Sequence, residues 1–304
     1  MKTLKTTILF ALTIAFGATA WAASYTWDGG GDGTTFDDAA NWTPAGSAFN
    51  TVDEYTIDDG SAVTVGADFS IGAFDLSNNS SLTIGLGNSV TINTTNATDI
   101  NSATLQVDGS LDFGSARWNV GGVGETFTGT VNGSLTGSGN FFAGFRMNAT
   151  LNVNGTVDMK VSRLGGVQST GVSRIINVNA GGEFYVNSQL TLESLAAAQT
   201  AVFLNGGLLD FSAADNYDYS ALTIDGNDGI VFTNASSSIT LEGDRTGEVN
   251  TWITDGALSS QVGSIQVNYD GGLDQTLVAI PEPSAVGLFG VVSLAAIGLR
   301  RRSR

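Results

Sequence analysis

The sequence contains no cysteine and no histidine. Without cysteine the chain can form no disulfide, even in an oxidising compartment. Without histidine it lacks the commonest general base and the commonest transition-metal ligand, and Ser-His and Cys-His nucleophile systems are excluded. Proline is also rare, with 3 residues among 304, whereas glycine accounts for 40. Carboxylates are therefore the main residues left for acid–base or metal chemistry.

Positive charge is scarce as well. The chain has 12 Lys and Arg against 29 Asp and Glu, which gives a formal net charge of −17. A surface this acidic repels phosphate backbones, so we expect no nucleic-acid partner. The hydrophobic content of 42% is nevertheless enough for a sizeable core. Between Ala23 and Ile280 the basic residues are Arg117, Arg146, Lys160, Arg163, Arg174 and Arg245.

The N-terminus has the three-part pattern of a secretory signal peptide. Its first residues are positively charged, the run from Thr6 to Phe16 is uncharged and largely apolar, and small residues follow. The apolar run is too short to span a bilayer comfortably, which argues against a permanent anchor. We expect a signal peptide at residues 1–22 that is cleaved after Ala22, with Ala20 and Ala23 as alternative positions.

The interior reads as a succession of short strands. Polar and apolar residues, many of them β-branched, alternate with a period of two, which is typical of half-buried strands. Helical periodicity is nearly absent, and Leu190–Gln199 is the one short candidate. The clearest strand segments are Ser81–Ile84, Ser89–Ile92, Thr104–Val107, Thr150–Val153, Ile175–Val178, Ala221–Ile224 and Ser238–Leu241.

Turn residues follow these strands at intervals of 20 to 26 residues. Many lie in Asn-Gly or Asp-Gly pairs, which supply the positive φ angles of tight turns. A repeat of this length is typical of a β-solenoid, whereas a β-sandwich needs no fixed repeat. We therefore predict an all-β, right-handed parallel β-helix over residues 61–278, with the sandwich as the alternative. The repeated glycines are Gly87, Gly109, Gly133, Gly155, Gly181, Gly206 and Gly226.

Residues 23–60 differ from the repeats because aromatic residues are concentrated in a Gly- and Asp-rich stretch. We interpret them as an N-terminal cap, since an open coil end would expose core and strand edges. The aromatics of this predicted cap are Trp27, Phe36, Trp42, Phe49 and Tyr55.

The C-terminal residues 279–304 differ in composition from both the repeats and the predicted cap. Pro281, Glu282 and Pro283 precede an uncharged, largely apolar stretch from Ser284 to Leu299, and a basic cluster follows at Arg300, Arg301 and Arg302. Sixteen helical residues reach about 24 Å, slightly less than a bilayer core, and local thinning can accommodate the difference. We expect a transmembrane helix with the arginines in the cytoplasm and the β domain in the periplasm.

Pro-Glu-Pro, an apolar stretch and an arginine cluster in this order resemble the PEP-CTERM sorting signal of Gram-negative bacteria. The resemblance implies recognition of Pro281, Glu282 and Pro283 by an exosortase, a membrane-embedded cysteine protease. It also implies transient anchoring in the inner membrane and final delivery to the cell surface or extracellular matrix. Such proteins are mostly found in bacteria that form biofilms and exopolysaccharides.

A weaker resemblance concerns the cap. Tyr25-Thr26-Trp27-Asp28-Gly29 with the following glycines, and then Asn41-Trp42, is similar to the segment before autotransporter-type β-solenoid repeats. Phe36 stands where a second Trp often occurs. The resemblance implies an adhesive or structural protein.

Carboxylates in the cap offer a candidate calcium site, because hard oxygen ligands on flexible loops can bind Ca²⁺. The candidates are Asp28, Asp32, Asp37 and Asp38, although their spacing fits neither an EF-hand nor a calcium β-roll. We otherwise expect no cofactor. Two further acidic groups are Asp53, Glu54, Asp58 and Asp59, and Asp215 with Asp218.

Two functional hypotheses follow. The first is a non-enzymatic surface or matrix protein, with a role in adhesion or biofilm and with exopolysaccharide or other surface proteins as partners. The second is a carbohydrate-binding or polysaccharide-degrading β-helix, in which paired carboxylates act on a glycosidic bond. Its candidate residues are the mixed-charge segment Val157–Arg163 and the aromatics Tyr217, Tyr219 and Trp252.

Overall fold

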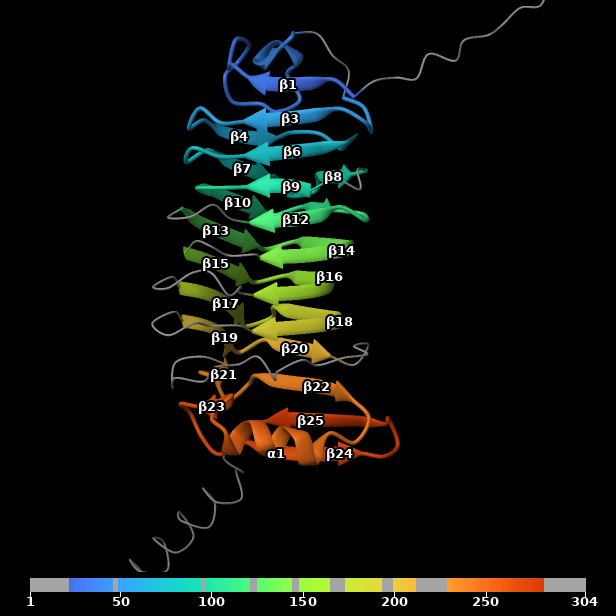
Figure 1. Ribbon diagram of the computed structural model, residues 1–304, viewed down its shortest axis with the longest axis vertical. Helices are drawn as coiled ribbons and strands as arrows, with labels where there is room; N and C mark the ends of the chain where they lie inside the picture. Colours follow the sequence, from blue (N-terminus) through green and yellow to red (C-terminus); the bar gives the residue numbers. More distant parts are fainter. Residues whose placement is uncertain are drawn as a thin grey trace, which may run out of the picture.

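The computed structural model describes residues 22–45, 49–93, 97–120, 125–143, 148–164, 173–192, 199–211 and 229–281. Within these ranges the chain winds into a stack of coils, with β1 (Ser24–Trp27) at one end and β24 (Gln266–Asp270) at the other (Figure 1). Strands of successive coils pair in parallel and in register, for example Val107 with Val131 and Val131 with Val153. This confirms the β-solenoid and is incompatible with the sandwich, whose hairpins are antiparallel.

One wall of the solenoid is a sheet of nine parallel strands. Each strand is short and alternates inward and outward residues, because one side faces the core and the other faces water. In spatial order the strands are β4 (Ala62–Val65), β7 (Ser81–Ile84), β10 (Ala103–Val107), β13 (Thr126–Val131), β15 (Asn148–Val153), β17 (Ser173–Asn179), β19 (Gln199–Asn205), β21 (Gly229–Phe232) and β23 (Leu258–Ser260).

The rest of each coil belongs to a second sheet of sixteen strands. In the first coils two separate strands form this wall, and at β14 they merge, since β14 pairs with both β11 and β12. The parallel strands are β3 (Glu54–Ile57), β5 (Phe69–Ile71), β6 (Ala73–Leu76), β8 (Ser89–Ile92), β9 (Ala97–Ile100), β11 (Ser110–Asp112), β12 (Arg117–Val120), β14 (Ser134–Ala143), β16 (Thr156–Leu164), β18 (Glu183–Leu192), β20 (Leu208–Phe211) and β22 (Ser238–Glu242).

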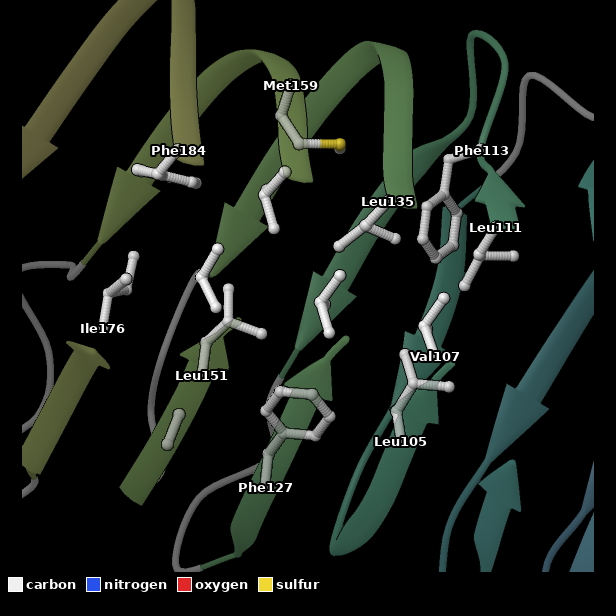
Figure 2. Close-up of a cluster of buried hydrophobic side chains, with 14 of the residues drawn as sticks. Leu105, Val107, Leu111, Phe113, Phe127, Leu135, Leu151, Met159, Ile176 and Phe184 are labelled. Atoms are coloured by element: carbon white, nitrogen blue, oxygen red, sulfur yellow. The ribbon is translucent and has the colours of Figure 1, made fainter. Parts of the chain in front are cut away.

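The core lies between the two walls, where apolar side chains form columns along the stack. The labelled side chains in Figure 2 point from both walls into this interior, and all of them are buried. Leu105, Leu151 and Ile176 belong to one column, in which the intervening position is Gly129. A Cβ at Gly129 would lie 2.9 Å from the ring of Phe127 and 2.8 Å from Leu151. Phe127 therefore occupies the space that a side chain would otherwise fill.

The repeated glycines are needed for close stacking of the backbone. We expected them to adopt positive φ, and Gly87, Gly181 and Gly206 do so. Gly109 and Gly133, in contrast, are not among the positive-φ residues. A Cβ on Gly133 would lie 1.9 Å from the carbonyl oxygen of Gly109, which no side chain tolerates. At these turns one backbone passes directly over another, and glycine is required because it has no side chain.

An asparagine ladder runs beside the stacked glycines. The side-chain Nδ2 of each asparagine donates to the side-chain oxygen one coil earlier, over 2.7 Å from Asn154 to Asn132, 2.7 Å from Asn179 to Asn154 and 3.1 Å from Asn205 to Asn179. All amides point the same way, so the ladder has a donor end. There Asn132 donates to the carboxylate of Asp108 over 2.6 Å. The negative charge thus lies at the positive end of aligned dipoles.

An aromatic cluster lies at the N-terminal end of the stack. β1 (Ser24–Trp27) pairs in parallel with β3 and antiparallel with β2 (Trp42–Thr43). The 3₁₀ helix η1 (Ala39–Asn41) leads into β2. Phe36 packs against the rings of Trp42 and Phe69 at centroid distances of 4.8 Å, so it links the cap to the first coil.

A second cap closes the C-terminal end, and the sequence did not predict it. Helix α1 (Thr246–Thr254) buries Val249 and Trp252. β25 (Gln275–Ala279) then pairs antiparallel with β22 and with β24 (Gln266–Asp270), which ends the parallel ladder. Apart from α1 and η1 the described residues contain no helix, which agrees with the all-β prediction. Leu190–Leu192 belong to β18 and Gln199 begins β19, while residues 193–198 of that helix candidate lie outside the described residues.

Candidate functional site

The residues before Pro281 belong to the folded C-terminal cap. Thr276 is buried, donates its hydroxyl to the carbonyl of Gly243 over 2.7 Å and accepts the backbone N–H of Arg245. Val278 and Ile280 are also buried, whereas Pro281 is exposed. The fold therefore buries the chain up to Ile280, and Pro281 is exposed directly after it.

At the N-terminal side the boundary of the cap lies between Ala22 and Ala23. Ala22 is exposed, and the backbone N–H of Ala23 donates to Asp53 Oδ1 over 2.9 Å. The carbonyl of Ala23 accepts the N–H of Glu54, also over 2.9 Å. Asp53 is almost completely buried, with 2% of its surface exposed, and also accepts the side-chain amide of Asn50. Ala23 is thus the first of the described residues with bonds to the cap.

The four aspartates of the candidate calcium site form hydrogen bonds that shape the cap loop. Asp37 accepts the N–H of Gly66 over 3.0 Å, and Asp38 accepts that of Ala40 over 3.0 Å at the start of η1. Asp28 accepts the hydroxyl of Thr43, which lowers its pKa. Within the described ranges no three His, Cys, Asp or Glu side chains gather closely enough to hold a metal ion.

Asp32 has the densest set of donors among these four. It accepts the hydroxyl of Thr35, the backbone N–H groups of Thr34 and Thr35, and the side-chain amide of Asn41. These donors lower the pKa of Asp32 well below its usual value, with the Thr35 hydroxyl as the largest cause. Buried Asn41 in turn accepts the N–H groups of Gly31 and Gly33, each over 2.9 Å. Sequence reasoning noted the Asn41-Trp42 pair but not this role of the amide.

The sequence of the tail decides its identity. Residues 279–302 match the family model described as the PEP-CTERM protein-sorting motif. This chain carries a PEP-CTERM sorting motif. The matched segment begins with the last residue of β25, so the motif and the folded cap share Ala279 and Ile280. The motif implies recognition by an exosortase, export and membrane-anchored sorting to the cell surface.

Most of the motif lies outside the described residues. Pro281 is described, whereas Glu282, Pro283, the stretch Ser284–Leu299 and the cluster Arg300–Arg302 are not. In the part of the chain that the structure covers, no helix is long and apolar enough to cross a membrane. The comparison with curated proteins gave no match, and neither did the comparison with solved structures.

The remaining acidic groups are separated by the fold. Asp53 lies at the cap boundary, while Asp58 and Asp59 are exposed in the turn after β3. Asp215 and Asp218 lie outside the described residues, together with Tyr217 and Tyr219. Trp252 is 7% exposed on α1, so its ring is part of the C-terminal cap and offers no platform for a sugar.

The mixed-charge segment forms part of β16, in which Asp158 lies on the outer face. Tyr185 of β18 is its neighbour across the sheet, and Asp210 of β20 follows Tyr185. The hydroxyl of Tyr185 donates to Glu183 Oε2 over 2.9 Å, and this bond raises the pKa of Tyr185. The outer face here combines three carboxylates with one partly exposed aromatic ring.

A shallow pocket lies beside this row. It is lined by the stacked glycines of two turns together with the side chains of Glu183, Leu208, Ser236 and Ser238. Sequence reasoning did not find the row, because Asp158, Tyr185 and Asp210 are 25 to 27 residues apart and become neighbours only through the coil register.

Proposed function

We propose that this chain is exported through a signal peptide at residues 1–22 and held in the inner membrane by Ser284–Leu299 until an exosortase acts on it. The β-solenoid then serves as a non-enzymatic structural or adhesive protein at the cell surface, in a biofilm or exopolysaccharide matrix. The observation that carries the proposal is the sorting motif at residues 279–302, which directly follows a solenoid capped at both ends.

The outer surface supports a structural role. Outward positions of the nine-stranded sheet are largely Thr and Asn, for example Thr104, Thr128 and Thr150 on three successive coils. Identical polar neighbours on successive strands can interact with one another across the sheet. The aspartates of the cap loop accept backbone N–H groups, as structural residues do. A protein built in this way exposes a long, acidic and hydrophilic surface suited to a hydrated matrix.

The decisive experiment concerns the tail. In cells that contain an exosortase, the double variant Pro281→Ala and Pro283→Ala should remain at full length in the inner membrane. Ser303→Ala, one residue beyond the matched segment, is the control and should be processed normally. Normal processing and release of the double variant would refute the sorting proposal. The readouts are the mass of the protein and its distribution between membrane and surface fractions.

A carbohydrate-binding role is the second candidate, and the row Asp158–Tyr185–Asp210 favours it. Carboxylates that accept sugar hydroxyl protons beside an aromatic ring are suited to bind a saccharide. The test is binding of the purified domain, residues 23–281, to a panel of polysaccharides, with Tyr185→Ala as the matched variant. Binding that Tyr185→Ala abolishes would favour this candidate, and turnover of any polysaccharide would contradict the non-enzymatic proposal.

A further inference from the structure

Asp53 is a buried carboxylate in a part of the chain that has no side-chain cation. Between Ala23 and Ala116 the sequence contains no lysine, arginine or histidine, while thirteen Asp and Glu residues lie in the same stretch. The first basic side chain, Arg117, is on β12, three strands from β3 in the sheet order. At about 4.8 Å between neighbouring strands, that separation is roughly 14 Å. A carboxylate with 2% exposure normally needs a positive partner or several donors.

The backbone nitrogen of Ala23 lies where such a partner would be. It is 2.9 Å from Asp53 Oδ1, and Asn50 binds Oδ2 of the same carboxylate. In the full-length chain this nitrogen belongs to the amide that joins Ala22 to Ala23 and has one hydrogen to donate. Ala22 is exposed and Ala23 is half-buried, so the chain leaves the cap between these two residues.

We propose that hydrolysis of the Ala22–Ala23 bond creates an α-ammonium group at Ala23, which forms a partly buried ion pair with Asp53 and locks the N-terminal cap. A signal peptidase adds water to the bond; the hydroxyl goes to the carbonyl of Ala22 and a hydrogen to the nitrogen of Ala23. The new amine takes up a further proton at neutral pH. The proposal rests on the proposed export through residues 1–22.

The geometry selects Ala22 over the two neighbouring cleavage positions. Cleavage after Ala20 would leave two residues before Ala23, so the nitrogen next to Asp53 would remain a neutral amide. Cleavage after Ala23 would remove both the donor to Asp53 and the carbonyl that accepts the N–H of Glu54. Only an N-terminus at Ala23 keeps both bonds and turns one of them into a charge-assisted bond, which is stronger than a neutral one.

The ion pair between Ala23 and Asp53 would stabilise more than one strand. The carbonyl of Asp53 accepts the N–H groups of Gly72 and Ala73, over 2.8 Å and 3.2 Å, where the next coil begins. The adjacent Glu54 starts β3 and pairs with Ser24 of β1. Asp53 therefore connects the new N-terminus, the cap loop at Asn50 and the first coil, so that processing would stabilise the cap after the chain has left the cytoplasm.

The first test is the N-terminal sequence and mass of the exported protein, which should begin at Ala23. The second compares two forms of residues 23–281, one with Ala23 as its free N-terminus and one with a Gly-Ser-Gly-Ser extension that makes this nitrogen an amide. Asp53→Asn should lower the Tm of the free form by about 3–5 °C more than that of the extended form. Exposed Asp58→Asn should affect the two forms equally.

An N-terminus at any other residue would overturn the proposal, and so would an equal loss from Asp53→Asn in both forms. If Asp53→Asn does not fold, the reaction of the Ala23 amine with an acylating reagent gives a second measurement on the wild-type protein. The amine should react at least 10-fold more slowly in the folded than in the urea-unfolded protein, and equal rates would overturn the ion pair. Neither test depends on the tail, so failure of exosortase processing would leave these results unchanged.

Discussion

The side-chain amide of Asn154 donates to the side-chain oxygen of Asn132 over 2.7 Å, and the same amide group accepts a bond from Asn179 one coil later. Three coils are thus joined outside the core by one side chain. An amide can hold this position because it has a donor and an acceptor, whereas a carboxylate has acceptors alone. Asp108 occupies the one end of the ladder where acceptors suffice, and it accepts bonds from both Asn132 and Gln106.

The ladder predicts a specific order of stabilities. Asn154→Ala removes two side-chain bonds and should lower the free energy of unfolding by about 1–2 kcal/mol. Asn154→Asp should cost more at pH 7, because it places a carboxylate against the oxygen of Asn132, and less at pH 3, where it can donate again. Exposed Asn250→Ala on α1 is the control and should be neutral or slightly stabilising. Urea unfolding at the two pH values measures all three variants, and equal costs of Asn154→Asp at both would contradict the ladder.

Two Gly→Ala substitutions should differ greatly in their effect on stability, because one lies at a stacked turn and the other does not. Gly133→Ala would place a Cβ 1.9 Å from the carbonyl oxygen of Gly109, so the coils must separate locally. We expect a loss of about 3 kcal/mol or more in the free energy of unfolding. Gly247→Ala on α1 meets nothing within 4 Å and should raise stability by up to about 1 kcal/mol. Similar effects of the two variants in denaturant unfolding would show that the turns do not stack as described.

The surroundings of Asp75 predict that removal of its charge stabilises the protein. Burial raises its pKa, and the neighbouring carboxylates of Asp99 and Glu54 act in the same direction. Asp75→Asn keeps an oxygen for the backbone N–H of Asp99, a 3.0 Å bond, and removes the unfavourable charge. The variant should melt about 1–3 °C higher than wild type at pH 7.

The pH dependence of this gain follows from the raised pKa. Asp75 is ionised in the unfolded chain at pH 7, and the fold disfavours this ionised form. As the pH falls through the folded-state pKa the native protein binds a proton first and the penalty disappears. The advantage of Asp75→Asn should therefore fade on acidification and be absent near pH 3. A constant advantage of Asp75→Asn at all pH values would refute the assignment.

For Asp32 we expect the opposite effect, a loss of stability when its charge is removed at pH 7. Its pKa is lowered in the fold, so its contribution to stability is fully present above the unfolded value of about 3.9 and is lost as the pH falls further. Asp32→Asn should destabilise the cap at pH 7 and make it less sensitive to acid than the wild type. Fluorescence of Trp27 and Trp42, both buried in the cap, can follow this. An acid transition of equal size in wild type and variant would contradict the role of Asp32.

The alternation in segments such as Ser81–Ile84 was sufficient to predict strands, and the glycine repeat was sufficient to predict coils. The reason for the glycines was not accessible, because the clash at Gly133 involves a residue 24 positions earlier, Gly109. Likewise, the sequence does not indicate that the two strands which each early coil contributes to the second wall become one strand at β14. That change depends on how successive coils pair.

Helix α1 was missed for a different reason. Its sequence Thr246–Thr254 contains Gly247 and several β-branched residues, which are poor helix formers. The helix is stabilised by the burial of Val249 and Trp252, and the surface that buries them exists only once the last coils are in place. The cap aromatics could be singled out from the sequence because five large rings in a short polar stretch can bury their area only together. The roles of Asn41 and Asp53 depend on individual bonds that no pattern reveals.

The strands lie across the long axis of the stack, so the hydrogen bonds between coils run along that axis (Figure 1). Tension along this axis, between contacts at the two ends of the stack, would load these bonds one coil at a time. A coil of 22–24 residues, the spacing of Gly109, Gly133 and Gly155, would release roughly 80 Å of extended chain. Under load the solenoid would thus lengthen in steps of one coil and dissipate mechanical work.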